Sequence, residues 1–429
     1  MPPAGAAALP PRTPFPGASA PGPARYDRQF IRKYGPSSGK TVLVLQPGSP
    51  SGQSNFGLLA PELVARVKGL QVWTVDRRSN AFEDPAGFQT GNPDIAGLYY
   101  AGVAPVGGKL FAPIEDAAAP YVHQWGAAVA LDDIRKVVLS AGDHGKRRVL
   151  LGGHSEGGVL TMAYAVWDFD GHPGYKDVDG LVFIDGALLD AFRAYLQGSL
   201  AAPMRTVARA RRVQATLNAQ TPFGSTSGLA GLPAWVTGIL PELGCQYALT
   251  APDAPSTLVG LLDALGAGAL LPPGTLPPGE VTNAGYMTYL FTKGPTSFRA
   301  RVDTRDASLA DVCQTFVTEP GDGMEWYFPT KIETDTLGAM ESLRPTNVTR
   351  YFGLRPSHFA DVDVPIYGFE TSLSNGGVMK AYRRFVRGSK IPSATLRSNQ
   401  QMGHLDPLMD TPASNTFLKT VVPFLRRFT

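Results

Sequence analysis

Short apolar runs and amphipathic stretches alternate along much of the chain. Four runs have the length and the β-branched composition of buried strands, at residues 40–45, 70–75, 147–151 and 181–184. Between them apolar residues recur at helical spacing, most regularly over residues 124–141. Strands that alternate with helices are typical of a parallel sheet that helices cover on both faces. The pattern therefore predicts an α/β fold.

The alternation stops after residue 186 and resumes after residue 358. The segment between is helical in places, rich in Pro and Gly, and without strand periodicity. Apolar runs at residues 364–369 and 394–397 then restore the pattern. We expect an α/β domain over residues 26–186 and 359–429, a largely helical cap inserted over residues 187–358, and a flexible arm, rich in Pro and Ala, over residues 1–25.

The composition narrows the class of protein. An apolar fraction of 43% against 17% charged residues describes a globular chain with a sizeable core. The net charge is +3 and the basic residues are scattered, so nucleic acid is not expected as a partner. No apolar run approaches the roughly 18 residues that a membrane span requires. No signal peptide is visible, so the protein is expected to be cytoplasmic, or secreted or periplasmic if such a segment has been removed.

One segment carries the pattern of a nucleophile. Gly153-His154-Ser155-Glu156-Gly157 matches G-x-S-x-G, directly after a predicted strand and before a predicted helix. A serine on such a sharp turn is exposed. It also lies near the amide of Glu156 and the positive end of the helix, which would stabilise an oxyanion. Residues 35–39 also match, but no helix follows them, so we interpret that segment as a turn.

With this motif in this context, residues 40–186 and 360–429 resemble the α/β-hydrolase superfamily, whereas the insertion does not. A serine nucleophile needs a base, and histidine is the usual one near neutral pH. The resemblance implies that the base follows the last strand, where His404 stands. His358, near the end of the insertion, is the runner-up. His154 should point away from the nucleophile. His144 and His172 are expected to be solvated in polar loops, and His123 is expected to be structural.

The resemblance also implies an acid that orients the base. Its expected place is just after the strand that begins at Val364, and Glu370 is the carboxylate there, since no Asp or Glu lies between residues 371 and 405. Asp185, at the end of residues 181–184, is the alternative. Asp406 is too close in sequence to His404 to be favoured.

The second amide of the family's oxyanion hole comes from the loop after an early strand. The corresponding loop here is Gln46-Pro47-Gly48-Ser49, which has Gln-Pro-Gly where the family usually has histidine. The amide of Ser49 is therefore the candidate donor beside that of Glu156, and a neighbouring residue stays open as an alternative.

The implied reaction is hydrolysis of a carboxylic ester, small or polymeric, through an acyl-enzyme on Ser155. A serine at this turn argues against relatives that use an aspartate, such as epoxide hydrolases. An amidase, peptidase or acyltransferase on the same triad stays open, as does a ligand-binding protein on a hydrolase fold.

Neither a cofactor nor a metal is implied, and the oligomeric state is not predicted. Cys245 and Cys313 lack a metal-ligand spacing and form either one disulfide or two buried thiols. The insertion is rich in aromatic residues, which either line an apolar substrate pocket or form the insertion's own core.

Overall fold

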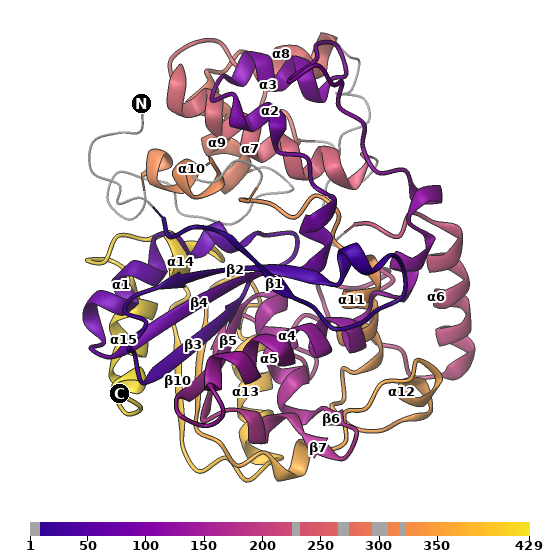
Figure 1. The fold of residues 1–429 in the computed structure, drawn as a ribbon, viewed down its shortest axis with the longest axis vertical. Coiled ribbons are helices and arrows are strands. Elements are labelled where there is room, and N and C mark those ends of the chain that lie inside the picture. Colours follow the sequence, from indigo (N-terminus) through magenta and orange to yellow (C-terminus); the bar gives the residue numbers. More distant parts are fainter. Residues whose placement is uncertain (1–8, 225–231, 265–273, 294–307, 318–321) are drawn as a thin grey trace.

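The structure, a computed structural model, describes residues 9–224, 232–264, 274–293, 308–317 and 322–429. Its centre is an eight-stranded sheet with the strand order β1-β2-β4-β3-β5-β8-β9-β10 (Figure 1). Six of these strands run parallel to one another: β3 (Thr41–Gln46), β4 (Leu70–Asp76), β5 (Arg148–His154), β8 (Gly180–Ile184), β9 (Ile366–Glu370) and β10 (Ala394–Ser398). They lie where the apolar runs predicted strands, so the predicted α/β fold with a mostly parallel sheet is confirmed.

Helices cover both faces of this sheet. Alternate residues of a strand serve opposite faces. Leu43 and Leu45 belong to one apolar cluster, whereas Val42 and Val44 belong to the other. Among the helices that pack in these clusters are α1 (Leu59–Arg66) and α15 (Thr416–Leu425) in the first, and α4 (Ala127–Gly142), α5 (Glu156–Val166) and α13 (Gly377–Arg387) in the second. All of β3 is therefore buried, which explains its continuous apolar run.

The N-terminal segment does not form a free arm where the structure describes it, from residue 9 onward. Residues Thr13–Pro16 form β1, which pairs antiparallel with β2 (Arg28–Tyr34), and β2 pairs antiparallel with β4. The prediction of a flexible arm is wrong for this stretch. Its prolines suggested a loop, but β1 lies at the edge of the sheet, where a missing N–H is tolerated. Residues 1–8 lie outside the described residues.

The insertion predicted as one cap is divided into two parts. Helices α7 (Ala234–Thr250), α8 (Thr257–Ala264), α9 (Asn283–Thr292) and α10 (Leu309–Val317) lie at the top of Figure 1, together with α2 (Ala86–Gln89) and α3 (Pro93–Tyr100). We call these six helices the cap lobe. The other helices of the insertion lie beside the sheet domain: α6 (Val207–Ala219), α11 (Thr330–Glu333) and α12 (Asn347–Tyr351). Helices α2 and α3 come from the polar, Gly-rich stretch before residue 122, so their contribution to the lobe was not predicted.

Two further observations bear on the sequence-based expectations. Cys245 on α7 and Cys313 on α10 are both free and buried, so the structure favours two thiols over a disulfide. None of the described helices combines the length and the apolar character that a membrane crossing requires.

Candidate active site

Ser155 stands at the junction of β5 and α5. Its backbone has φ 54° and ψ −121°, a strained conformation for a residue with a side chain. The turn is anchored because the Ser155 amide donates to the carbonyl oxygen of Ile184 at 2.9 Å. Close packing also requires glycine nearby, since a Cβ atom on Gly157 would lie 2.0 Å from the carbonyl oxygen of Gln46. The sequence motif thus forms the strained strand-to-helix turn that its context predicted.

His404 and Asp185 are joined by a short hydrogen bond. The ring Nδ1 of His404 donates to Oδ2 of Asp185 at 2.6 Å. Asp185 directly follows β8 and is fully buried, and it also accepts bonds from the Thr371 amide, at 2.9 Å, and the Thr371 hydroxyl. Burial alone would raise the pKa of Asp185, but the bonds from His404 and Thr371 outweigh it and hold the pKa below its ordinary value. A carboxylate therefore faces the imidazole at neutral pH.

Glu370, the acid preferred from the sequence, has other partners. One carboxylate oxygen accepts from the Ser374 hydroxyl and from the Met379 amide, both at 2.9 Å. The other accepts from Ser398 and Gln400, both at 3.2 Å. Because the Met379 amide lies in the first turn of α13, the carboxylate caps that helix.

The structure thus pairs His404 with Asp185, the alternative acid, while Glu370 caps α13. The carboxylate of Asp185, at the end of β8, reaches the imidazole, whereas the carboxylate of Glu370, at the end of the neighbouring strand β9, is bound by the segment that begins α13.

The loop after β3 runs directly beside the nucleophile. A Cβ atom on Gly48 would lie 2.9 Å from Cβ of Ser155, so the Gly48 backbone is in close contact with the serine. The next residue, Ser49, donates its hydroxyl to Oε1 of Glu333 at 2.5 Å. Glu156 is the first residue of α5, which places its amide at the positive end of that helix. Both candidate oxyanion donors therefore belong to segments that meet at Ser155.

The side chain of Glu156 turns away from solvent and is buried beside the insertion. Its Oε1 accepts a hydrogen bond from Thr336 at 2.9 Å, and Thr336 belongs to a π-helical turn, residues Thr334–Ala339. Burial, together with the neighbouring Glu333 carboxylate, raises the pKa of Glu156 well above its ordinary value. From the sequence, Glu156 was considered only as the donor of a backbone amide to the oxyanion, and not for its side chain. Its contacts come from residues far along the chain, so no local pattern could have shown them.

Two other histidines occupy defined places. His358, the runner-up base, lies 2.9 Å from Asp168 of the small β6–β7 hairpin (Asp168–Phe169 and His172–Pro173), so it is paired with a different carboxylate. His154 is buried, and its Nε2 donates to the backbone carbonyl of His404 at 2.8 Å. Burial, with His404 close by, lowers the pKa of His154 to about 3. His154 was expected to point away from the nucleophile, and its contact with the His404 backbone was not predicted.

Comparisons with known proteins support the fold. No protein-family model matches the chain, and no curated protein matches it in sequence. A candidate lipase of Sulfolobus solfataricus has a similar solved structure, with a TM-score of 0.51 and 14% identity, covering 96% of this chain and 93% of the other. Epoxide hydrolase A of Mycobacterium thermoresistibile aligns over 98% of this chain and 99% of its own, with a TM-score of 0.47 and 15% identity. The order of the strands, the strained turn at Ser155 and the first of these likenesses together show that the chain has the α/β-hydrolase fold.

Proposed function

We propose that the protein is a serine hydrolase that cleaves a carboxylic ester through an acyl-enzyme on Ser155. The observation that carries this proposal is the hydrogen bond from His404 Nδ1 to Asp185. Because that bond keeps the proton on Nδ1, the neutral imidazole presents an unprotonated Nε2, which is the atom a general base uses.

The reaction follows from these groups. The Ser155 hydroxyl attacks the ester carbonyl and gives its proton to Nε2 of His404, and the carbonyl oxygen becomes an oxyanion. The amides of Glu156 and of the Gly48–Ser49 loop are the proposed donors to that oxyanion. His404 then protonates the departing alcohol, and the acyl group stays on Ser155. A water molecule, deprotonated by His404, releases the carboxylic acid and restores the serine.

The aromatic residues of the cap lobe do not by themselves mark a substrate pocket. Most of them are buried and pack on one another, as Phe88 of α2 does on Tyr100 of α3 with ring centroids 4.7 Å apart. These residues therefore form the core of the lobe. The size of the acyl pocket is measured by the chain length of the esters that the protein hydrolyses.

The test is hydrolysis of p-nitrophenyl esters of increasing chain length by the wild type and by Ser155→Ala. We expect turnover by the wild type and its loss in the variant, with a fluorophosphonate adding its mass to Ser155 alone. Ser37→Ala is the matched control, because Ser37 lies in the second G-x-S-x-G match on an exposed turn. Activity that survives in Ser155→Ala would refute the proposal. Turnover of p-nitroanilides without any turnover of esters would move the assignment to an amidase.

A further inference from the structure

Arg77 holds the loop that lies against Ser155. It directly follows β4, and its side chain is buried. One terminal nitrogen of its guanidinium donates to the carbonyl oxygen of Pro47 at 2.6 Å. The other donates to the carbonyl oxygen of Gly48 at 3.2 Å and to Oε2 of Glu325 at 2.6 Å. A single cation thus binds two consecutive carbonyl groups of the loop.

The planarity of the peptide group gives these bonds a consequence for the amides. The Gly48 carbonyl shares one rigid plane with the Ser49 N–H, and the Pro47 carbonyl shares another with the Gly48 N–H. In a trans peptide the two groups point in opposite directions. When Arg77 fixes where the two carbonyls point, it also fixes where the amides of Gly48 and Ser49 point. A cation on a carbonyl oxygen further polarises the same peptide, which makes its N–H a stronger donor.

We propose that Arg77 is a positioning residue of the oxyanion hole: it aims and polarises the loop amides that face the charge developing on the substrate. This inference rests on the proposed function, because it concerns how the same site stabilises its transition state. Donors that are held in place before the reaction cost no reorganisation during it, and this is the main source of their catalytic effect.

Arg77 is also held by a segment of the insertion. Glu325 pairs with Arg77 and accepts a bond from the Ser79 hydroxyl, and its amide donates to the Pro50 carbonyl at 2.8 Å. Two residues further along the loop, the Gly52 amide donates to the carbonyl oxygen of Gly323 at 3.1 Å. The loop after β3 is therefore bound both by Arg77 and by residues 323–325.

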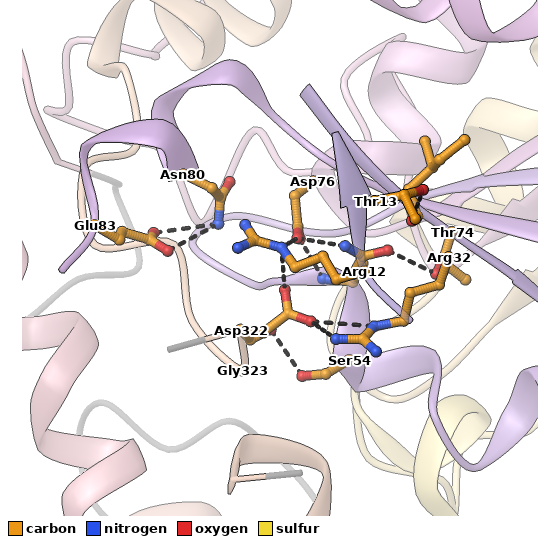
Figure 2. Close-up of polar contacts among 12 residues, drawn as sticks. Arg12, Thr13, Arg32, Ser54, Thr74, Asp76, Asn80, Glu83, Asp322 and Gly323 are labelled. Atoms are coloured by element: carbon orange, nitrogen blue, oxygen red, sulfur yellow. Dashed lines mark hydrogen bonds and ion pairs between the residues drawn. The ribbon is translucent and has the colours of Figure 1, made fainter. Parts of the chain in front are cut away.

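Residues 322–325 are themselves fixed by buried charges. Figure 2 shows Asp322 between two arginines: its carboxylate lies 2.6 Å from Arg32 and 3.5 Å from Arg12, and Arg12 also pairs with Asp76 at 2.9 Å. Glu242 of the cap lobe accepts from the Gly323 and Met324 amides at 3.0 and 2.8 Å. The partner of Arg77 is thus anchored to the sheet and to the lobe, which keeps the guanidinium in one place.

Arg78 offers a matched control. It is as buried as Arg77 and equally bonded, with its guanidinium 2.7 Å from Asp133 and 3.0 Å from Asp27. Arg78 also donates to the carbonyl oxygen of Ala18 at 2.7 Å. Its contacts therefore tie the N-terminal segment, which holds Ala18 and Asp27, to α4, which holds Asp133. Replacement of either arginine removes a buried cation, but only the replacement of Arg77 removes the guanidinium from the Pro47 and Gly48 carbonyls. The Gly48 carbonyl then keeps only its bond from the Ser51 amide, at 3.1 Å.

The experiment compares Arg77→Met, Arg77→Lys and Arg78→Met with the wild type on p-nitrophenyl butyrate, with thermal unfolding measured for each. For Arg77→Met we expect kcat to fall about tenfold to a hundredfold, somewhat less than loss of a whole oxyanion donor. KM should stay within about twofold, because the lost interaction is made in the transition state. The kcat of Arg77→Lys should lie between those of the wild type and Arg77→Met, because one ammonium group cannot bind both carbonyls. Arg78→Met should unfold at a lower temperature while kcat of the folded protein is unchanged.

A second measurement separates this inference from the proposed function. The rate at which a fluorophosphonate modifies Ser155 also depends on the oxyanion hole, and it requires no knowledge of the natural ester. A wild type that neither turns over esters nor reacts at Ser155 would overturn both proposals. A wild type that reacts, with Arg77→Met reacting equally fast, would overturn the role of Arg77 alone, as would equal losses of kcat in the Arg77 and Arg78 variants. If Arg77→Met does not fold, the comparison of Arg77→Lys with the wild type tests the inference instead. An unchanged kcat in Arg77→Lys would then refute it.

Discussion

The ring Nε2 of His154 lies 2.8 Å from the backbone carbonyl oxygen of His404. A carbonyl can only accept, so Nε2 carries a proton. Because burial and the nearby His404 lower the pKa of His154 to about 3, the ring is neutral at neutral pH and Nδ1 is unprotonated. The two imidazole rings are 4.3 Å apart, and a proton on His154 would repel the charge that His404 acquires during the proposed reaction. The residue before the nucleophile therefore holds the backbone of the proposed base without competing for its proton.

Replacement of His154 by Phe should slow the proposed reaction modestly. The lost hydrogen bond is worth about 1 kcal/mol, which corresponds to roughly a fivefold fall in kcat if it positions His404. His154→Gln, which can donate from its amide, should recover part of that loss. The pH profile of kcat/KM is the decisive readout. Because the pKa of His154 is about 3, His154 does not titrate in the working range, and the acidic limb of the pH profile should keep the same midpoint in both variants. A midpoint that moves would show that His154 titrates in the working range.

Asp185 and Glu370 should respond differently to the loss of charge. Asp185→Asn replaces the carboxylate with a neutral amide that can donate to Nδ1 and so favours the wrong tautomer of the imidazole, and we expect kcat to fall by as much as about 10⁴-fold. Glu370→Gln removes acceptors from Ser398 and Gln400 and weakens the cap of α13, so it should lower the free energy of unfolding by about 1 kcal/mol and leave kcat near that of the wild type. Steady-state kinetics beside urea unfolding of each variant measures both effects. The reverse pattern would restore Glu370 as the acid.

Glu242 should make the protein less stable as the pH rises. Burial raises its pKa to about 8 from an ordinary value of 4.5, so the folded protein keeps the proton over a range in which the unfolded chain has lost it. The stabilisation is complete below pH 4.5 and is lost as the pH rises to about 8. Glu242→Gln cannot ionise, and its unfolding temperature should therefore fall less between pH 5 and pH 8 than that of the wild type. Equal slopes in the two proteins would contradict this.

The sequence was sufficient for the parallel strands because each is buried on both faces, which leaves an unbroken apolar run such as residues 41–46. The edge strand β1 could not be predicted, since Pro14 and Pro16 resemble a loop until β2 pairs with them. The partner of His404 was beyond local patterns for a similar reason. Which carboxylate reaches the imidazole depends on how the loops after the strands place each side chain, and that placement is a property of the tertiary fold. Arg77 and Glu325, 248 positions apart in the chain, meet only in three dimensions.

The cap lobe is built from two separate segments of the chain, and this limits how the protein can be re-engineered. The lobe takes α2 and α3 from upstream of Ser155 and α7–α10 from downstream of Asp185, and Tyr247 of α7 donates to Asp94 of α3 at 2.8 Å. A chimera that exchanged residues 187–358 alone would leave α2 and α3 facing foreign helices and would remove the partner of Arg77. A transplantable cassette must therefore include residues 83–111 as well, and it must carry a carboxylate at the position of Glu325.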